Sequence, residues 1–60
     1  MNLYSLLEVM DADLWFQVEQ NHETVYKGLR DGFKDRAKYE RYEVKAIWYS
    51  HPRNTLMIEI

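Results

Sequence analysis

The sequence predicts a single α+β domain over residues 1–60, in which an N-terminal helix packs on an antiparallel sheet of about four strands. Three observations support this fold class. Apolar residues at the N-terminus recur at helical spacing, two later segments alternate apolar and polar residues, and each of those segments contains a polar break where a hairpin can turn. A short helix or loop is expected to connect the two hairpins.

The N-terminal helix is predicted from one stripe of apolar side chains. Leu3, Leu6, Leu7 and Met10 stand at i, i+3, i+4 and i+7, which places them on the same helical face. Asn2 precedes the stripe and suits an N-cap, because its side-chain oxygen can accept a hydrogen bond from a first-turn amide. A turn is expected at residues 11–13, and a helix this short needs a sheet to pack against.

The first hairpin is predicted over residues 14–27. Alternation from Phe16 onward turns Phe16 and Val18 toward the helix and leaves the intervening polar residues outside, beside Trp15. Asn21-His22 forms the polar break at which the chain reverses.

The connection over residues 29–40 places Leu29, Phe33 and Ala37 at i, i+4 and i+8, which fits a short amphipathic helix or helical turn. An irregular excursion is the alternative, because Gly32 lies inside the pattern and costs about 1 kcal/mol relative to alanine.

The second hairpin is predicted from residues 42–49, a turn at 50–54 and a final strand at 55–60. The side chains expected to face the core are Val44, Ala46 and Trp48 from the first strand and Leu56, Ile58 and Ile60 from the second.

Composition supplies no catalytic or metal-binding signature. The chain has no cysteine, and its two serines, Ser5 and Ser50, lie in the predicted helix and beside His51. Adjacent Ser and His side chains rarely reach a common reacting atom, and no zinc-ligand spacing or phosphate-binding glycine loop is present. Asp11 and Asp13 are expected to end the helix and not to hold a cation. We therefore expect no enzyme activity, no cofactor and no metal.

The apolar stretches are too short for a membrane span, and the N-terminus lacks the pattern of a secretory signal. We therefore expect a soluble protein in the cytoplasm, without a membrane partner.

Charge is divided along the chain. Residues 1–23 carry five acidic and no basic side chains, whereas residues 24–60 carry eight basic and five acidic ones. The acidic residues of the first part are Glu8, Asp11, Asp13, Glu19 and Glu23. They suggest phosphate mimicry as one hypothesis, although most charged surfaces are simply solvated.

The opening "LYSLLEVMDADLWFQV", the "VYKG" after the first turn and the ending "YEVKAIWYSHPRNTLMIEI" resemble small accessory proteins of Gram-positive bacterial phages and mobile elements. The resemblance extends over most of the chain and concerns core positions. It implies a phage accessory protein that binds and disables a host factor such as a defence protein. It transfers no functional residue.

The chain has more large apolar side chains than a single helix can cover on a sheet. A single helix leaves the other sheet face open, so several aromatics are expected on that face or at a sheet edge, where they mark protein interfaces. The predicted protein-binding residues are Trp15, Tyr26, Tyr42, Ile47 and Tyr49. Alternatively, residues 29–40 cover these side chains as a second small core, or the patch is used for homo-oligomerisation.

A basic segment gives a second functional hypothesis. Cations over residues 27–41 are interleaved with aromatics, a pattern that suits phosphates and unpaired bases, although acidic residues are mixed among them. The candidate nucleic-acid-binding residues are Lys27, Arg30, Lys34, Arg36, Lys38 and Arg41. The leading expectation is a non-enzymatic protein-binding module that inhibits a host protein. The alternatives are a nucleic-acid-binding regulator and a homo-oligomeric structural protein.

Overall fold

Helix α1 (Leu3–Val9) buries the predicted apolar stripe in the computed structural model, which describes residues 1–60. Asn2 is the N-cap, and its side-chain oxygen accepts a hydrogen bond from the Ser5 amide at 2.9 Å. After the helix, the Asp13 amide donates to the Asp11 carboxylate at 2.9 Å and closes the predicted turn. The sequence prediction for this segment is confirmed.

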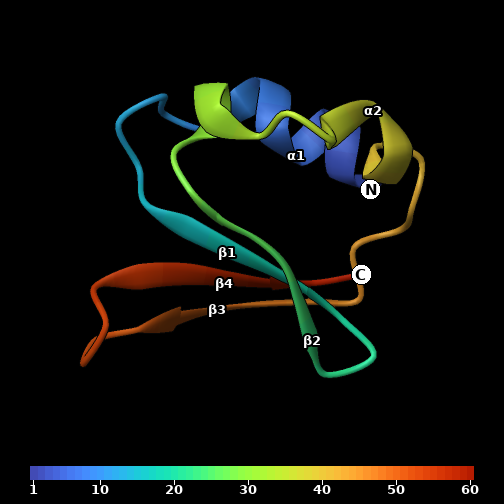
Figure 1. Cartoon of the computed structure of the whole chain (residues 1–60). Helices are drawn as coiled ribbons and strands as arrows, with labels where there is room; N and C mark the ends of the chain where they lie inside the picture. Colours follow the sequence, from blue (N-terminus) through green and yellow to red (C-terminus); the bar gives the residue numbers. More distant parts are fainter.

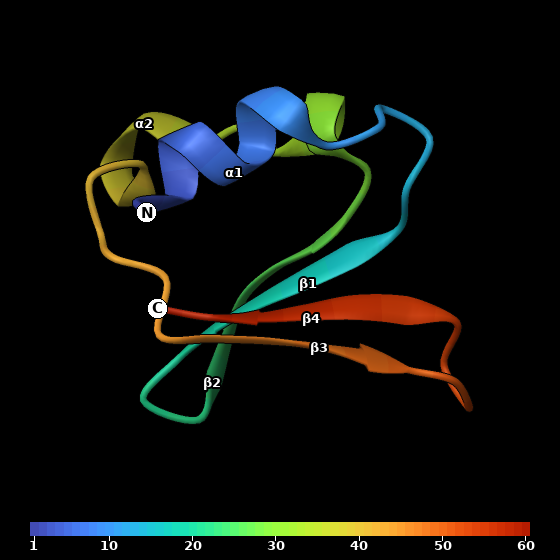
Figure 2. The ribbon, with the colours of Figure 1, turned by 180° about the vertical axis from the view of Figure 1, so that it is seen from behind.

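Four strands form one sheet beneath the helices (Figure 1). The elements that follow α1 are β1 (Phe16–Gln20), β2 (Glu23–Gly28), the 3₁₀ turn η1 (Arg30–Gly32), α2 (Arg36–Tyr39), β3 (Ala46–Ser50) and β4 (Thr55–Glu59). Both views of the ribbon place α1 and α2 on the same side of the sheet (Figure 2). The α+β fold class is therefore confirmed.

The strand order is β2-β1-β4-β3, so each predicted hairpin occupies one half of the sheet. Within each hairpin the strands are antiparallel, whereas the central pair, β1 and β4, is parallel. The sheet is thus mixed, with β2 and β3 as its edges. Sequence alternation identified the strands but contained no signal for their order.

The first hairpin turns at Asn21 and His22, as predicted. Both residues have positive φ angles, 52° and 68°, as the two central residues of a type I′ turn require. Asparagine tolerates this conformation better than most residues, which explains how the turn forms without glycine. The pairing of β1 with β2 then shifts between Val18 and Glu19, so that an extra residue of β2 bulges out of the ladder.

The hydrophobic core lies between α1 and the sheet. Phe16 and Val18 of β1 meet Ile58 and Ile60 of the C-terminal segment beneath the leucines of α1. The amide of Ile60 donates to the Glu19 carbonyl at 2.9 Å, so the C-terminal residue continues the parallel pairing. The predicted inward face of the last strand is therefore confirmed.

Residues 29–42 form an irregular excursion in which only Phe33 is buried in the core, while Leu29 and Ala37 remain exposed. The Phe33 ring stacks on Tyr26 with centroids 4.4 Å apart, and the Tyr26 hydroxyl donates to the Leu29 carbonyl at 2.6 Å. A Cβ at Gly28 or at Gly32 would approach this hydroxyl to 2.6 Å, so the absence of a side chain at Gly32 makes room for Tyr26. Leu29, Phe33 and Ala37 therefore do not form one buried helical stripe. The segment is an irregular excursion that contains two short helical turns, η1 and α2, so the predicted short helix or loop between the hairpins is confirmed.

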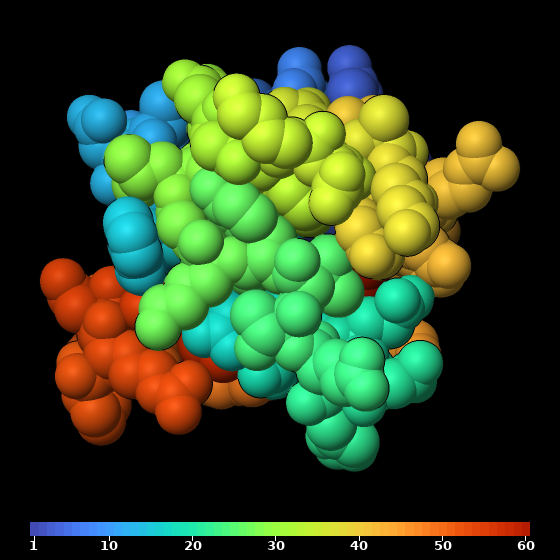
Figure 3. All heavy atoms as spheres, viewed as in Figure 1, coloured from blue at the N-terminus to red at the C-terminus, as the bar shows by residue number.

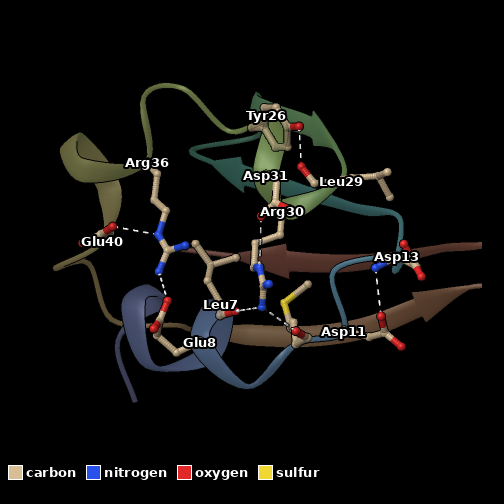
Figure 4. Close-up of polar contacts among 11 residues, drawn as sticks. Leu7, Glu8, Asp11, Asp13, Tyr26, Leu29, Arg30, Asp31, Arg36 and Glu40 are labelled. Atoms are coloured by element: carbon tan, nitrogen blue, oxygen red, sulfur yellow. Dashed lines mark hydrogen bonds and ion pairs between the residues drawn. The ribbon is translucent and has the colours of Figure 1, made fainter.

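Two arginines fasten this excursion to α1 (Figure 4). Arg30 donates to the carbonyls of Met10 at 2.8 Å and Leu7 at 3.4 Å, and so satisfies groups that the end of α1 leaves without helical partners. Arg36 forms ion pairs with Glu8 and, at 2.7 Å, with Glu40. The hydrogen bond with Glu8 is the main cause of a raised pKa for the Arg36 guanidinium, which keeps its charge.

Trp48 and Ala46 were wrongly assigned to the core, because both lie on the face of the sheet away from the helices. Register places Trp48 opposite Met57, on the face away from the helices, while Ile47 lies opposite Ile58 on the helix side. The strand begins only at Ala46, and the Lys45 amide donates to Glu59 at 2.7 Å, one residue out of the regular register. The alternation counted from Val44 therefore does not continue through β3.

None of the helices combines the length and the apolar character needed to cross a membrane.

Replacing Leu7 by alanine tests the core. Leu7 is fully buried, so Leu7→Ala is expected to lower the free energy of unfolding by roughly 2–5 kcal/mol, most of what a domain of this size has. Leu29→Ala is the matched control, because Leu29 is exposed and its loss is expected to cost under about 1 kcal/mol. Urea denaturation followed by circular dichroism measures both, and equal losses would contradict this core.

Candidate protein-binding surface

One face of the sheet has no layer packed on it, and we call it the open face. Both helices lie on the opposite side, as the two ribbon views show (Figure 1; Figure 2). Strand alternation and register place Gln17, Lys27, Met57 and Trp48 side by side across its middle. Trp15 extends this face, because its carbonyl accepts the Leu56 amide at 3.1 Å and continues the β1–β4 ladder.

The centre of the open face is buried although no second layer covers it. Met57, Gln17 and Thr55 are each no more than 5% exposed. Since nothing packs above them, the flanking side chains of this same face must shield them. The Gln17 amide also donates to Thr24 at 3.0 Å and Glu19 at 3.2 Å, which satisfies a polar group that would otherwise be costly to bury.

The two tryptophans flank this buried centre and stay accessible. Trp15 is 45% exposed and Trp48 is 44% exposed. They lie toward the two sides of the central strand β4, since Trp15 precedes β1 and Trp48 belongs to β3. Half-exposed tryptophans around a close-packed centre are typical of surfaces that bind proteins.

The edge strand β3 is apolar on both faces. Ile47 and Tyr49 lie opposite Ile58 and Leu56 on the helix side, yet they are 45% and 40% exposed. The turn of the β3–β4 hairpin, coloured orange to red, lies at a lower corner of the molecule, away from the helical layer (Figure 3). The Tyr49 hydroxyl is hydrogen-bonded to Asn54 of the adjoining turn.

The five predicted binding residues thus fall in four places. Trp15 lies on the open face, Ile47 and Tyr49 lie at the β3 edge, and Tyr42 is exposed at the end of the excursion, where its ring is 6.2 Å from that of Tyr39. Tyr26 lies inside, stacked on Phe33. Residues 29–40 therefore cover only Tyr26 of the five, and the alternative in which they bury all these side chains as a second small core does not occur.

Sequence reasoning missed Trp48, which it assigned to the core. The run Ile47-Trp48-Tyr49 has no polar residue to mark the outer face, so alternation alone was ambiguous there. The useful signal was length: three consecutive large apolar residues in a strand cannot all face one core.

The six candidate nucleic-acid-binding cations do not form one surface. Arg30 and Arg36 are engaged with α1 and with Glu8 and Glu40. Lys27 lies on the open face, opposite Gln17. The three that remain exposed in or beside the excursion without an ion pair are Lys34, Lys38 and Arg41.

The acidic residues of the first part are likewise dispersed. Glu8 is on α1, Glu19 is on the open face and Glu23 begins β2, so they do not imitate a row of phosphates. No group of three or more acidic or histidine side chains is placed to hold a metal ion, and the surface has no pocket.

Comparison of the chain with protein families, with curated proteins and with solved structures finds no match.

Tryptophan fluorescence tests the geometry of the open face. In dilute solution, where the chain is monomeric, the single-tryptophan variants Trp15→Phe and Trp48→Phe are expected to be quenched by acrylamide to similar extents, because the two indoles of one chain have nearly equal exposed fractions, 45% and 44%. Quenching of the urea-unfolded variants gives the fully exposed reference. A tryptophan that is strongly protected in the folded protein would contradict the arrangement.

Proposed function

We propose that this chain is a small non-enzymatic binding module that docks on another protein through its open face. The observation that carries the proposal is the pair of half-exposed tryptophans, Trp15 and Trp48, beside the buried side chains of Gln17, Met57 and Thr55. Tryptophans are among the residues that contribute most binding energy at interfaces. A rigid sheet also holds them in place, so little conformational entropy is lost on binding.

The partner we propose is a host protein of a bacterial cell, such as a defence protein, which the module inhibits. This part of the proposal is supported by the resemblance of the opening and closing segments to phage accessory proteins. The open face fits a partner that offers an apolar patch with an acidic group near Lys27, because Lys27 is the one cation that register aligns with Gln17 and Met57.

Nucleic-acid binding is the weaker candidate. Three exposed cations, Lys34, Lys38 and Arg41, favour it, but Asp31 and Asp35 are exposed among them. Two of the six original candidates are also occupied by contacts within the fold. A net charge of −2 adds no general attraction for phosphates.

Capture of partners from bacterial lysate tests the proposal. The tagged protein is expected to retain a stoichiometric protein partner after nuclease treatment, and Trp15→Ala and Trp48→Ala are each expected to weaken that complex by more than about tenfold. Tyr42→Ala is the matched control, because Tyr42 is 44% exposed but lies away from the open face. Circular dichroism verifies that each variant is folded.

Two results would contradict the proposal. If Tyr42→Ala abolished binding and the tryptophan variants did not, the docking surface would lie on the excursion. If nuclease released the bound material and Lys34→Glu with Lys38→Glu prevented capture, the nucleic-acid alternative would replace it.

A further inference from the structure

Along the outer edge of β3, backbone N–H and C=O groups face away from the sheet, as they would to pair with a further strand. The amides of Leu56 and Ile60 donate to β1, so the alternate residues of β4 direct their backbone groups toward β3. Their register partners, Ala46, Trp48 and Ser50, use their own groups in that ladder. The N–H and C=O groups of the remaining two residues, Ile47 and Tyr49, therefore point out of the sheet, and no turn, loop or cap hydrogen bond involves them.

The two edges of the sheet differ in their protection against strand addition. At the β2 edge, a bulge interrupts the ladder and Glu23 and Lys27 supply charges. Such features commonly keep edge strands from pairing. The β3 edge has no bulge within Ala46–Ser50, no charged residue and no proline, and it exposes three consecutive apolar side chains.

The outward groups suit one symmetrical arrangement. If a second copy of β3 lies antiparallel with Trp48 on the twofold axis, Ile47 of each copy is opposite Tyr49 of the other. Both residues of each such pair direct N–H and C=O groups across the junction, so the pairs exchange complementary hydrogen bonds. A register centred on Ile47 would bring Lys45 into the pairing, and one centred on Tyr49 would bring in His51. The Lys45 amide already donates to the Glu59 carbonyl, so it is not free to pair across the junction.

The side chains fit the same register. Trp48 meets Trp48 of the second copy at a non-hydrogen-bonded position, where opposed side chains are closest. On the other face, each Ile47 meets a Tyr49, which is a favourable aromatic and β-branched pair. At the ends, Ala46 meets Ser50, and both side chains are small. None of the five residues is charged, so no like charges are opposed.

We infer that this protein forms a twofold homodimer in which the β3 strands of two copies pair antiparallel about Trp48 and join the two sheets into one. This self-complementarity selects a second copy over an unrelated strand. The inference goes beyond the proposed function, because the dimer forms through backbone groups of Ile47 and Tyr49. Trp15 is two strands away, so the open faces of the two copies continue into one another.

Cysteine cross-linking tests the register. The chain has no cysteine, so the single-cysteine variants Trp48→Cys and Ile47→Cys can be compared directly. In the proposed dimer, the two Cα atoms at residue 48 are about 4.5 Å apart, within disulfide range. Those at residue 47 are offset by two residues, beyond the roughly 7 Å limit. Mild oxidation is expected to give disulfide dimers at least about tenfold faster for Trp48→Cys. Equal rates, or faster cross-linking at residue 47, would overturn the proposal.

Sedimentation equilibrium of the full chain tests the dimer without cysteines. The unmodified protein is expected to change from dimer to monomer as it is diluted. Tyr49→Pro is expected to weaken the dimer roughly 30-fold or more, because two intermolecular hydrogen bonds are lost. The Tyr49 amide faces outward, so the β3–β4 ladder is preserved. Tyr49→Phe, which keeps the amide, is expected to dimerise.

The outcomes separate this inference from the proposed function. Trp15→Ala is expected to lose the host partner and keep the dimer, whereas Tyr49→Pro is expected to do the reverse. A chain that stays monomeric at the highest concentration would overturn the dimer and leave the open face unaffected. A dimer that is lost with Trp15→Ala and kept with Tyr49→Pro would also overturn it.

Discussion

The parallel pairing of β1 with β4 is the constraint on which the rest of this structure depends. It is the only ladder between the two hairpins, because β2 and β3 each bond to a single neighbour within their own hairpin. It brings Phe16 and Val18 beside Ile58 and so assembles the sheet side of the core under α1. Antiparallel hairpins form locally, whereas this pairing unites residues some 40 positions apart, so the fold is completed only when both hairpins meet.

The same pairing decides which aromatic residues are buried. With β1 and β4 in the centre, α1 and the excursion cover the middle of one face, and Phe16, Tyr26 and Phe33 share that core. None of the described elements packs on the other face or beyond the β3 edge, so Trp15 and Trp48 stay half-exposed. The side chains that flank Met57 on the open face shield it instead. Apolar surface left in this way is available for binding.

Local chemistry predicted much of the fold. The leucine stripe, the Asn2 cap and both hairpin turns follow from side-chain spacing and turn preference, which neighbouring residues determine. The strand order and the role of Trp48 did not follow, because they depend on pairings between distant residues and on the point at which β3 begins. The roles of Arg30 and Arg36 did not follow either, since their carbonyl and carboxylate partners lie on α1 and its C-cap, 20 or more residues away. Trp15, Tyr42 and Tyr49 are exposed as predicted, whereas Tyr26 lies inside and Trp48, which was assigned to the core, lies outside.

Residue-resolved amide hydrogen exchange, followed by NMR in dilute solution, tests the central pairing most directly. The amides of Leu56 and Ile60, which donate to Trp15 and Glu19, are expected to be among the slowest to exchange, because they open only when the two halves separate. The amides of Ile47 and Tyr49 face outward and are expected to exchange rapidly in the monomer. Fast exchange at Leu56 and Ile60, or slow exchange at Ile47 and Tyr49 in a monomer, would contradict a sheet centred on β1 and β4 with β3 at its edge.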